Sequence, residues 1–206
     1  MPQVIGAAAA SGAAPGGRPR ARVLIPMLVF CLLVWPLAAR AQDEPAFRVV
    51  GGNVSIDDGV VYLSAHIDLD LSAEAVRALE NGVPLTIELQ IAVTRPRWWW
   101  FDEDVAYLTQ RYRIRFHALS RRYVLTSLNS GESRSYNSRD AVLERLGELK
   151  ALPLLDRGLL EPGETYQVGL RARLDLDALP RPLRASAYVS PQWRLVSDWF
   201  TWQLSS

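Results

Sequence analysis

Two sets of side chains in this sequence have the types and the spacing for binding chemistry. The first is the aromatic run 98–101, and the second is a row of arginines at every second position, Arg111, Arg113 and Arg115. Tryptophan combines a large apolar ring with one polar N–H group, which suits interfaces. Arginines at alternate positions lie on one face of a strand, where their charges attract anions. The candidate binding residues are therefore Trp98, Trp99, Trp100, Arg111, Arg113 and Arg115.

The arginine row also has a structural interpretation, which we favour. Asp68, Asp70 and Glu88 occupy outward positions on other expected strands. Carboxylates on neighbouring strands would relieve the repulsion between arginines that share a face. We therefore expect Arg113 and Arg115 to form cross-strand ion pairs, and the alternative is a strip that binds phosphate, lipid headgroups or an acidic partner.

The tryptophans suit either a core or an interface. An uncovered run of three would form an adhesive apolar patch, and the tryptophan-rich C-terminal segment is the obvious cover. We therefore expect Trp202 and at least one of Trp98, Trp99 and Trp100 to share one buried cluster. A coplanar exposed pair beside a cleft would instead favour glycan binding.

Catalytic and metal-binding patterns are missing from the sequence. It contains one cysteine, Cys31, and neither a G-x-S-x-G motif nor a phosphate-binding glycine loop. His66 shares a strand face with Asp68 and Asp70, but nothing in the sequence supplies the remaining ligands of a zinc site. We expect His66 and His117 to be surface residues, and we predict a non-enzymatic protein with no catalytic residue, metal or cofactor.

Strands must position the candidate residues, because apolar and polar side chains alternate along most of the chain. Asp57-Asp58-Gly59 predicts a hairpin turn between two such runs. Short helices are predicted over 72–79, with Ser72 as N-cap, and over 138–149. The alternating runs are 61–71, 85–93, 108–116 and 166–176. The pattern predicts a mainly β fold, an antiparallel β-sandwich or strongly bent sheet of about seven strands with two short helices.

Proline marks the expected connections in the second half of the chain. Pro153 and Pro162-Gly163 bound a predicted connecting segment. Pro180-Arg181-Pro182 predicts a turn before the last, tryptophan-rich stretch, Tyr188 to Leu204.

The N-terminal segment has the three parts of a secretory signal peptide. Arginines precede a 15-residue apolar run, 23–37, and Ala39-Arg40-Ala41 follows it. We predict a signal peptide over 1–41, cleavage before Gln42, and a single periplasmic β-rich domain over 42–206. The alternative is an inner-membrane anchor formed by residues 23–37, which is short for a bilayer span.

Charge argues against a nucleic-acid partner. Four of the 23 basic side chains lie within residues 1–41, where there is no acidic one, so the predicted mature domain carries 19 basic and 22 acidic side chains. A mildly acidic domain lacks the positive surface that binds a phosphate backbone. We therefore expect no nucleic acid, and membrane contact only through the signal segment before its cleavage.

A series of motifs resembles one family. The series is Trp-Trp-x-Phe at 98–101, Tyr-Arg-Ile at 112–114 with a following Leu-Ser-x-x-Tyr, Leu-Pro-x-Pro-Leu-Arg at 179–184 and Trp-Arg-Leu-x-Ser-x-Trp-x-x-Trp at 193–202. Over Ala46 to Leu204 the chain resembles an uncharacterised family of proteobacterial exported proteins, a domain of unknown function of the proline-rich signal peptide type. The resemblance brings no catalytic residues. Genes of the family it resembles are associated with genes for a nitrogen-regulation-type sensor kinase, so the resemblance implies a role in envelope signalling.

Together these observations predict an exported, non-enzymatic envelope domain. We expect it to bind a protein, for example a sensor kinase, or another envelope component through an aromatic and arginine-bearing surface. The alternatives are a glycan- or lipid-binding module and, less favoured, a periplasmic hydrolase. Exposure of the tryptophans is the feature that separates the binding hypotheses from a packing role.

Overall fold

The structure is a computed structural model that describes residues 47–99 and 101–205. The predicted signal peptide, residues 1–41, lies outside these ranges, so it stays a prediction. Within the described ranges no helix is both long enough and apolar enough to cross a bilayer. The elements, in chain order, are β1 (Phe47–Asp57), β2 (Val60–Leu69), α2 (Ala73–Glu80), β3 (Leu85–Arg95), β4 (Glu103–His117), β5 (Arg122–Ser127), β6 (Ser133–Tyr136), α3 (Arg139–Gly147), β7 (Glu148–Asp156), the 3-10 turn η1 (Arg157–Leu159), β8 (Thr165–Leu174), α4 (Arg181–Val189), the 3-10 turn η2 (Pro191–Trp193) and β9 (Phe200–Ser205).

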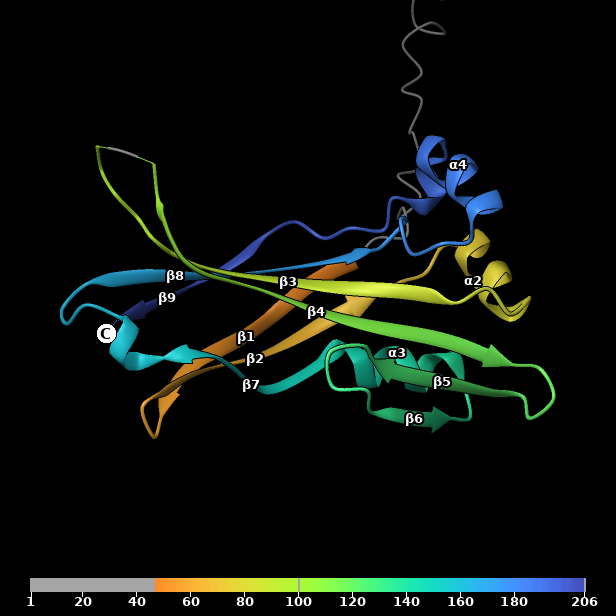
Figure 1. The fold of residues 1–206 in the computed structure, drawn as a ribbon, viewed down its shortest axis with the longest axis horizontal. Coiled ribbons are helices and arrows are strands. Elements are labelled where there is room, and N and C mark those ends of the chain that lie inside the picture. The colour runs from red at the N-terminus through yellow and green to blue at the C-terminus, as the bar shows by residue number, and fades with distance from the viewer. Residues whose placement is uncertain (1–46, 100, 206) are drawn as a thin grey trace, which may run out of the picture. The chain divides into compact units, whose positions relative to one another are not determined.

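The described strands form two antiparallel sheets that share one core. The smaller sheet has the order β1-β2-β7, and the larger has the order β6-β5-β4-β3-β8-β9. In Figure 1 the strands β1 and β2 cross the larger sheet obliquely. Buried apolar side chains from both sheets form a single cluster. The prediction of a mainly β, antiparallel fold is confirmed, with nine strands and three α-helices in the described ranges instead of about seven strands and two helices.

The first hairpin forms where the sequence predicts it. Asp58 and Gly59 have φ angles of 45° and 79°, so the turn between β1 and β2 uses two left-handed residues, as two-residue hairpin loops do. The inward residues Val61 and Leu63 have no exposed surface, whereas the outward His66 is exposed. The alternation in the sequence therefore identifies the buried face of β2 correctly.

Strand β3 lies in the middle of the larger sheet and has two different buried faces. Its inward face is apolar and includes Ile87, Leu89 and Ile91, all without exposed surface. Its outward face carries Glu88 and Gln90, which are also buried. Neighbouring strands on both sides cover these polar residues with their own side chains.

Both predicted helices are present, and each begins at a serine. The hydroxyl of Ser72 accepts a hydrogen bond from the Ala75 amide at the start of α2, and Ser138 caps α3 in the same way. The expected helix over 138–149 is too long, because α3 ends at Gly147. A Cβ atom on Gly147 would lie 2.2 Å from the carbonyl oxygen of Ile67, so the chain there lies directly against β2. It continues as β7 along that strand.

Two expectations based on proline are wrong. The predicted turn at Pro180-Arg181-Pro182 is instead the start of α4, because proline fits the first turn of a helix, where amide groups lack partners anyway. Pro153 lies inside β7 and not in a connecting segment. Strand β7 is at the edge of its sheet, where proline costs no ladder hydrogen bond on the open side.

Candidate functional site

The aromatic run lies at the tip of the β3–β4 hairpin. Trp98, Trp99 and Phe101 are 89%, 66% and 84% exposed. The rings of Trp98 and Trp99 meet edge to face, with centroids 4.8 Å apart and an interplanar angle of 78°. Figure 1 shows this hairpin extending away from the neighbouring strands at one end of the larger sheet. The tip, which we define by Trp98, Trp99 and Phe101, is therefore an exposed apolar surface on a projecting support.

The expected burial of this run with Trp202 is wrong for two of its three tryptophans. Trp202 is partly buried against the core, and its Nε1 donates a hydrogen bond to the Gly52 carbonyl oxygen at 3.0 Å. Trp98 and Trp99 are instead on the surface, and Trp100 lies outside the described residues. The physical reason is the length of the hairpin, which carries the run beyond the segment that was expected to cover it.

An ionic cluster holds the base of the tip. Arg95 donates to Glu103 through its Nε at 2.9 Å, and Arg97 also donates to Glu103. A further ion pair of 2.6 Å joins Arg95 to Glu161, just after η1. The hydrogen bond from Arg95 and, after it, that from Arg97 lower the pKa of Glu103, so its carboxylate stays charged. These contacts connect the two strands of the hairpin to a third segment of the chain.

The arginine row lies on the outward face of the larger sheet, and within residues 47–99 and 101–205 only its first member, Arg111, pairs with a carboxylate. Arg111 Nε is 3.7 Å from Glu88 Oε2, and Arg173 of β8 approaches the same oxygen to 3.3 Å. Gln90 donates to the other oxygen, Oε1, at 2.7 Å. Burial raises the pKa of Glu88, but the hydrogen bonds from Gln90 and Arg173 and the two arginine charges outweigh this and lower it. The buried carboxylate is therefore charged and satisfied on both sides.

The expected ion pairs of the other two members do not form. Among the described residues, no carboxylate lies within 4.0 Å of Arg113 or Arg115. Arg113 is opposite Thr86 on one side and Thr126 on the other, and Arg115 is opposite Val124. Of the three acids expected to face this row, Asp68 and Asp70 lie on or just after β2 of the smaller sheet, and Glu88 of β3 is opposite Arg111.

The structure separates the two predicted halves of the binding surface. Glu103, at the tip end of β4, is eight residues from Arg111, a distance of about 27 Å along an extended strand. The tip and the arginine row therefore form two surfaces. The tip gathers three strongly exposed aromatic rings, whereas on the arginine-bearing face of β4 the exposed ring is that of Tyr107.

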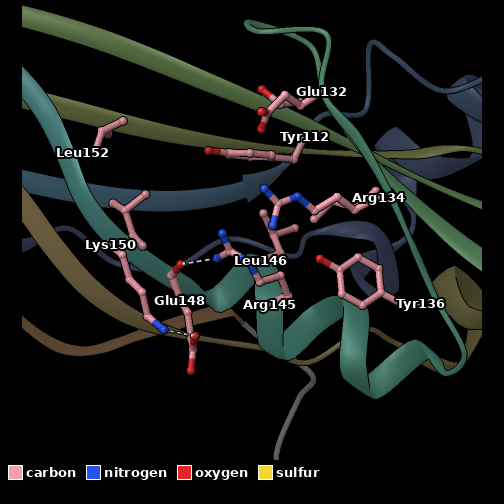
Figure 2. Close-up of a pocket in the computed structure, with 12 residues that line it drawn as sticks. Tyr112, Glu132, Arg134, Tyr136, Arg145, Leu146, Glu148, Lys150 and Leu152 are labelled. Atoms are coloured by element: carbon pink, nitrogen blue, oxygen red, sulfur yellow. Dashed lines mark hydrogen bonds and ion pairs between the residues drawn. The ribbon is translucent and has the colours of Figure 1, made fainter.

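A pocket that the sequence analysis missed lies between the larger sheet and α3 (Figure 2). Its volume is about 170 Å³. The inward faces of β4, β5 and β6 form one wall, and the end of α3 with the start of β7 forms the other. The polar side chains around it are Tyr112, Ser127, Glu132, Arg134, Tyr136, Arg145, Glu148 and Lys150, and the apolar ones are Leu125, Leu146, Leu149 and Leu152.

Three cationic and two acidic side chains surround this pocket, and they form different contacts. They are Arg134, Arg145, Lys150, Glu132 and Glu148. Lys150 Nζ forms an ion pair with Glu148 Oε2 at 2.8 Å, and this contact lowers the pKa of Glu148. Arg145 donates to the backbone oxygen of Glu148 at 3.0 Å. Burial raises the pKa of the Tyr112 hydroxyl, while the charge of Arg145 acts in the opposite direction. Sequence reasoning missed this site because its walls come from strands and a helix that no local pattern connects.

Neither histidine is at the tip or lines the pocket, although His66 of β2 is opposite the pocket residue Glu148 of β7. His66 Nε2 is 3.4 Å from Asp68 Oδ1 on the outer face of β2, and Arg48 contacts the same aspartate. In the described part of the chain, no three histidine, cysteine or acidic side chains gather as metal ligands would. His117 ends β4 and is exposed.

Comparison with known proteins gives one family. The profile described as Domain of unknown function (DUF4390) matches residues 45–203. This span agrees with the range of the resemblance, and it confirms membership of an uncharacterised family. No curated protein and no solved structure gives a significant match.

Proposed function

The chain belongs to the DUF4390 family, a domain of unknown function, and we propose that it is an exported, non-enzymatic module that docks another envelope protein through the tip of the β3–β4 hairpin. In this proposal a signal peptide over 1–41 directs the domain to the periplasm of a proteobacterium. The partner belongs to envelope signalling, with a sensor kinase as the first candidate.

The observation that carries the proposal is the exposure of Trp98 and Trp99. Soluble proteins seldom expose neighbouring large apolar side chains without a use for them, and tryptophan is the residue most enriched among binding hot spots. The cluster of Arg95, Arg97 and Glu103 supports the tip from below. Because these contacts fix the hairpin before a partner binds, less conformational entropy is lost on association.

The charges beside the tip favour a protein over a lipid surface. Glu103 and Glu161 together balance the charges of Arg95 and Arg97 at the base, and the exposed Asp102 and Asp104 add negative charge next to the rings. Carboxylates at this place are repelled by anionic headgroups. They fit a protein groove that has an apolar floor and a basic rim.

The ring geometry also argues against a sugar as the partner. Trp98 and Trp99 meet edge to face and so do not offer two parallel faces to a pyranose ring. An apolar pocket in a partner accepts such a wedge more readily, because shape complementarity does not require the two rings to be coplanar.

Photo-crosslinking in intact cells tests the proposal. A photoreactive phenylalanine analogue replaces Trp98 in one variant and Leu119 in another, since Leu119 is fully exposed in the turn at the other end of β4. We expect one crosslinked protein from position 98 and none from position 119. Adding Trp99→Ala should remove the product, and with the purified partner it should weaken binding about 30-fold or more, as for a hot-spot residue.

Three results would overturn the proposal. Equal crosslinking from positions 98 and 119, or a product that survives Trp99→Ala, would show that the tip does not select the partner. Flotation of the purified protein with phosphatidylethanolamine and phosphatidylglycerol vesicles, lost in the Trp98→Ala Trp99→Ala variant, would assign the tip to a membrane instead.

A further inference from the structure

The pocket between β6 and α3 carries an inference that is independent of the tip. We propose that it binds the carboxylate of a small organic acid, held by the guanidinium groups of Arg134 and Arg145 above an apolar floor.

The strand register directs Arg134 into this pocket. Arg134 of β6 is opposite Leu125 of β5, and opposed residues of an antiparallel pair point to the same side of the sheet. Leu125 packs against the core, so Arg134 lies on the inward face, where a sandwich would ordinarily place an apolar residue. In Figure 2 its side chain reaches toward the middle of the pocket from one side, and Arg145 approaches from α3.

The pocket's own carboxylates offset its positive charge only in part, since three cations face two carboxylates. Glu148 is engaged by Lys150. Glu132 and Arg134 are separated by more than ion-pair distance, since no contact within 4.0 Å joins them in the described part of the chain. Arg145 gives one N–H to the Glu148 carbonyl and retains other donors. Two guanidinium groups directed into one hollow would each gain from an anion between them.

The remaining wall favours an organic acid over an inorganic anion. Leu125, Leu146, Leu149 and Leu152 supply apolar surface, which suits a short hydrocarbon chain. The Tyr112 hydroxyl, whose pKa burial raises further above neutral pH, is protonated and can donate to a carboxylate oxygen. The pocket, about 170 Å³ in volume, has room for a carboxylate with a short hydrocarbon chain.

Calorimetric titration of the purified full chain with three probes tests the assignment. Butanoate carries the proposed chemistry, butanamide has the same shape without the charge, and inorganic phosphate carries charge without the apolar part. We expect butanoate to bind with a dissociation constant of about 10 mM or below and at least tenfold more tightly than either of the other probes.

The variants separate the pocket from general electrostatics. Arg134→Gln should weaken butanoate binding about tenfold or more, since a charged hydrogen bond is lost. Arg115→Gln is the matched control, because Arg115 is an exposed arginine on the other face of the same sheet, and it should change binding less than twofold. Glu132→Gln removes a carboxylate beside the pocket and should strengthen binding.

Several outcomes would overturn the inference. They are no butanoate binding, equal binding of butanoate and butanamide, tighter binding of phosphate, and equal losses from Arg134→Gln and Arg115→Gln. The thermal midpoints of both arginine variants must equal that of the unchanged protein, so that a loss of binding is not a loss of folding. If Arg134→Gln fails to fold, Tyr112→Phe is the second pocket variant, and it should weaken butanoate binding severalfold.

Discussion

At the scale of single residues, Glu88 shows how a buried charge is accommodated in this sheet. Its side chain is 5% exposed and lies between Arg111 and Arg173 on the two neighbouring strands. The arginines are themselves 55% and 39% exposed, so water screens part of the attraction. The hydrogen bond from Gln90 completes the set of partners. Removing the carboxylate therefore leaves two arginines crowded without compensation.

We predict that Glu88→Gln lowers the free energy of unfolding by about 1–3 kcal/mol at neutral pH. The folded pKa of Glu88 lies below its usual value of 4.5, so the stabilisation is complete above that value and is lost as the pH falls through the folded pKa. Urea unfolding of both proteins over a range of pH checks this. The difference between them should shrink below pH 4.5, and a constant difference would contradict the role given to the charge. Glu132→Gln, at an exposed site, should show neither effect.

The arginine row of β4 shows that a sequence pattern does not determine which residues form ion pairs. The alternation in β4 puts Arg111, Arg113 and Arg115 on one face, as the sequence predicts. Which of them meets a carboxylate depends on the register between strands and on the acid at one position of β3. A residue pattern specifies the face, whereas the partner is decided by a pairing that joins segments far apart in the chain.

At the scale of elements, the β1–β2 hairpin combines a predictable turn with an unpredictable close contact. The turn at Asp58 and Gly59 follows from residue types that tolerate positive φ. A register shift occurs between Val49 and Gly51, and beyond it Gly52 lies against β2. A Cβ atom on Gly52 would be 2.2 Å from the Ser64 carbonyl oxygen.

We predict that Gly52→Ala destabilises the protein by about 1–3 kcal/mol or more, because the backbone must shift to admit the methyl group. Gly51→Ala is the matched control, since a Cβ atom there would have no neighbour within 4 Å. The urea midpoint should fall for Gly52→Ala with an unchanged slope, and it should stay constant or rise slightly for Gly51→Ala. Equal midpoints for the two variants would show that the close contact does not form.

Helices and prolines differ in how well the sequence predicts the elements that contain them. Ser72 and Ser138 begin the two expected helices at the positions that their capping chemistry indicates. The end of α3 depends on the contact of Gly147 with Ile67, and so on tertiary structure. Pro182 supports α4 and Pro153 sits in an edge strand, because proline is compatible with both places as well as with loops.

At the scale of the whole molecule, strand pairing creates both candidate sites. The larger sheet is six strands wide and the smaller is three, so β5 and β6 are covered by α3 instead of by strands. The pocket lies under that part of the sheet, and its walls come from residues up to 40 positions apart. The exposed tip arises because β3 and β4 continue pairing to Arg95 and Glu103. Neither the pocket nor the exposed tip can be predicted from the hydrophobic periodicity of the sequence. The periodicity indicates which face of a strand a side chain lies on, but not which element packs against that face.

The C-terminal strand gives a test of how the two sheets are joined. Trp202 of β9 belongs to the larger sheet, packs against the core and donates a hydrogen bond to Gly52 in the smaller sheet. Trp98 is the same residue type at 89% exposure. Replacing each tryptophan by alanine therefore compares the same substitution at a packed position, Trp202, and at an exposed one, Trp98.

We predict that Trp202→Ala lowers the free energy of unfolding by about 2–3 kcal/mol, below the 3–5 kcal/mol range of fully buried aromatic residues because part of the ring is exposed. Trp98→Ala should change it by less than about 0.5 kcal/mol. Thermal unfolding followed by circular dichroism measures both. Equal effects of the two substitutions would contradict the assignment of Trp202 to the core and of Trp98 to the surface. A large loss from Trp98→Ala alone would show that the tip packs against the domain, and it would remove the exposed ring on which the proposed docking depends.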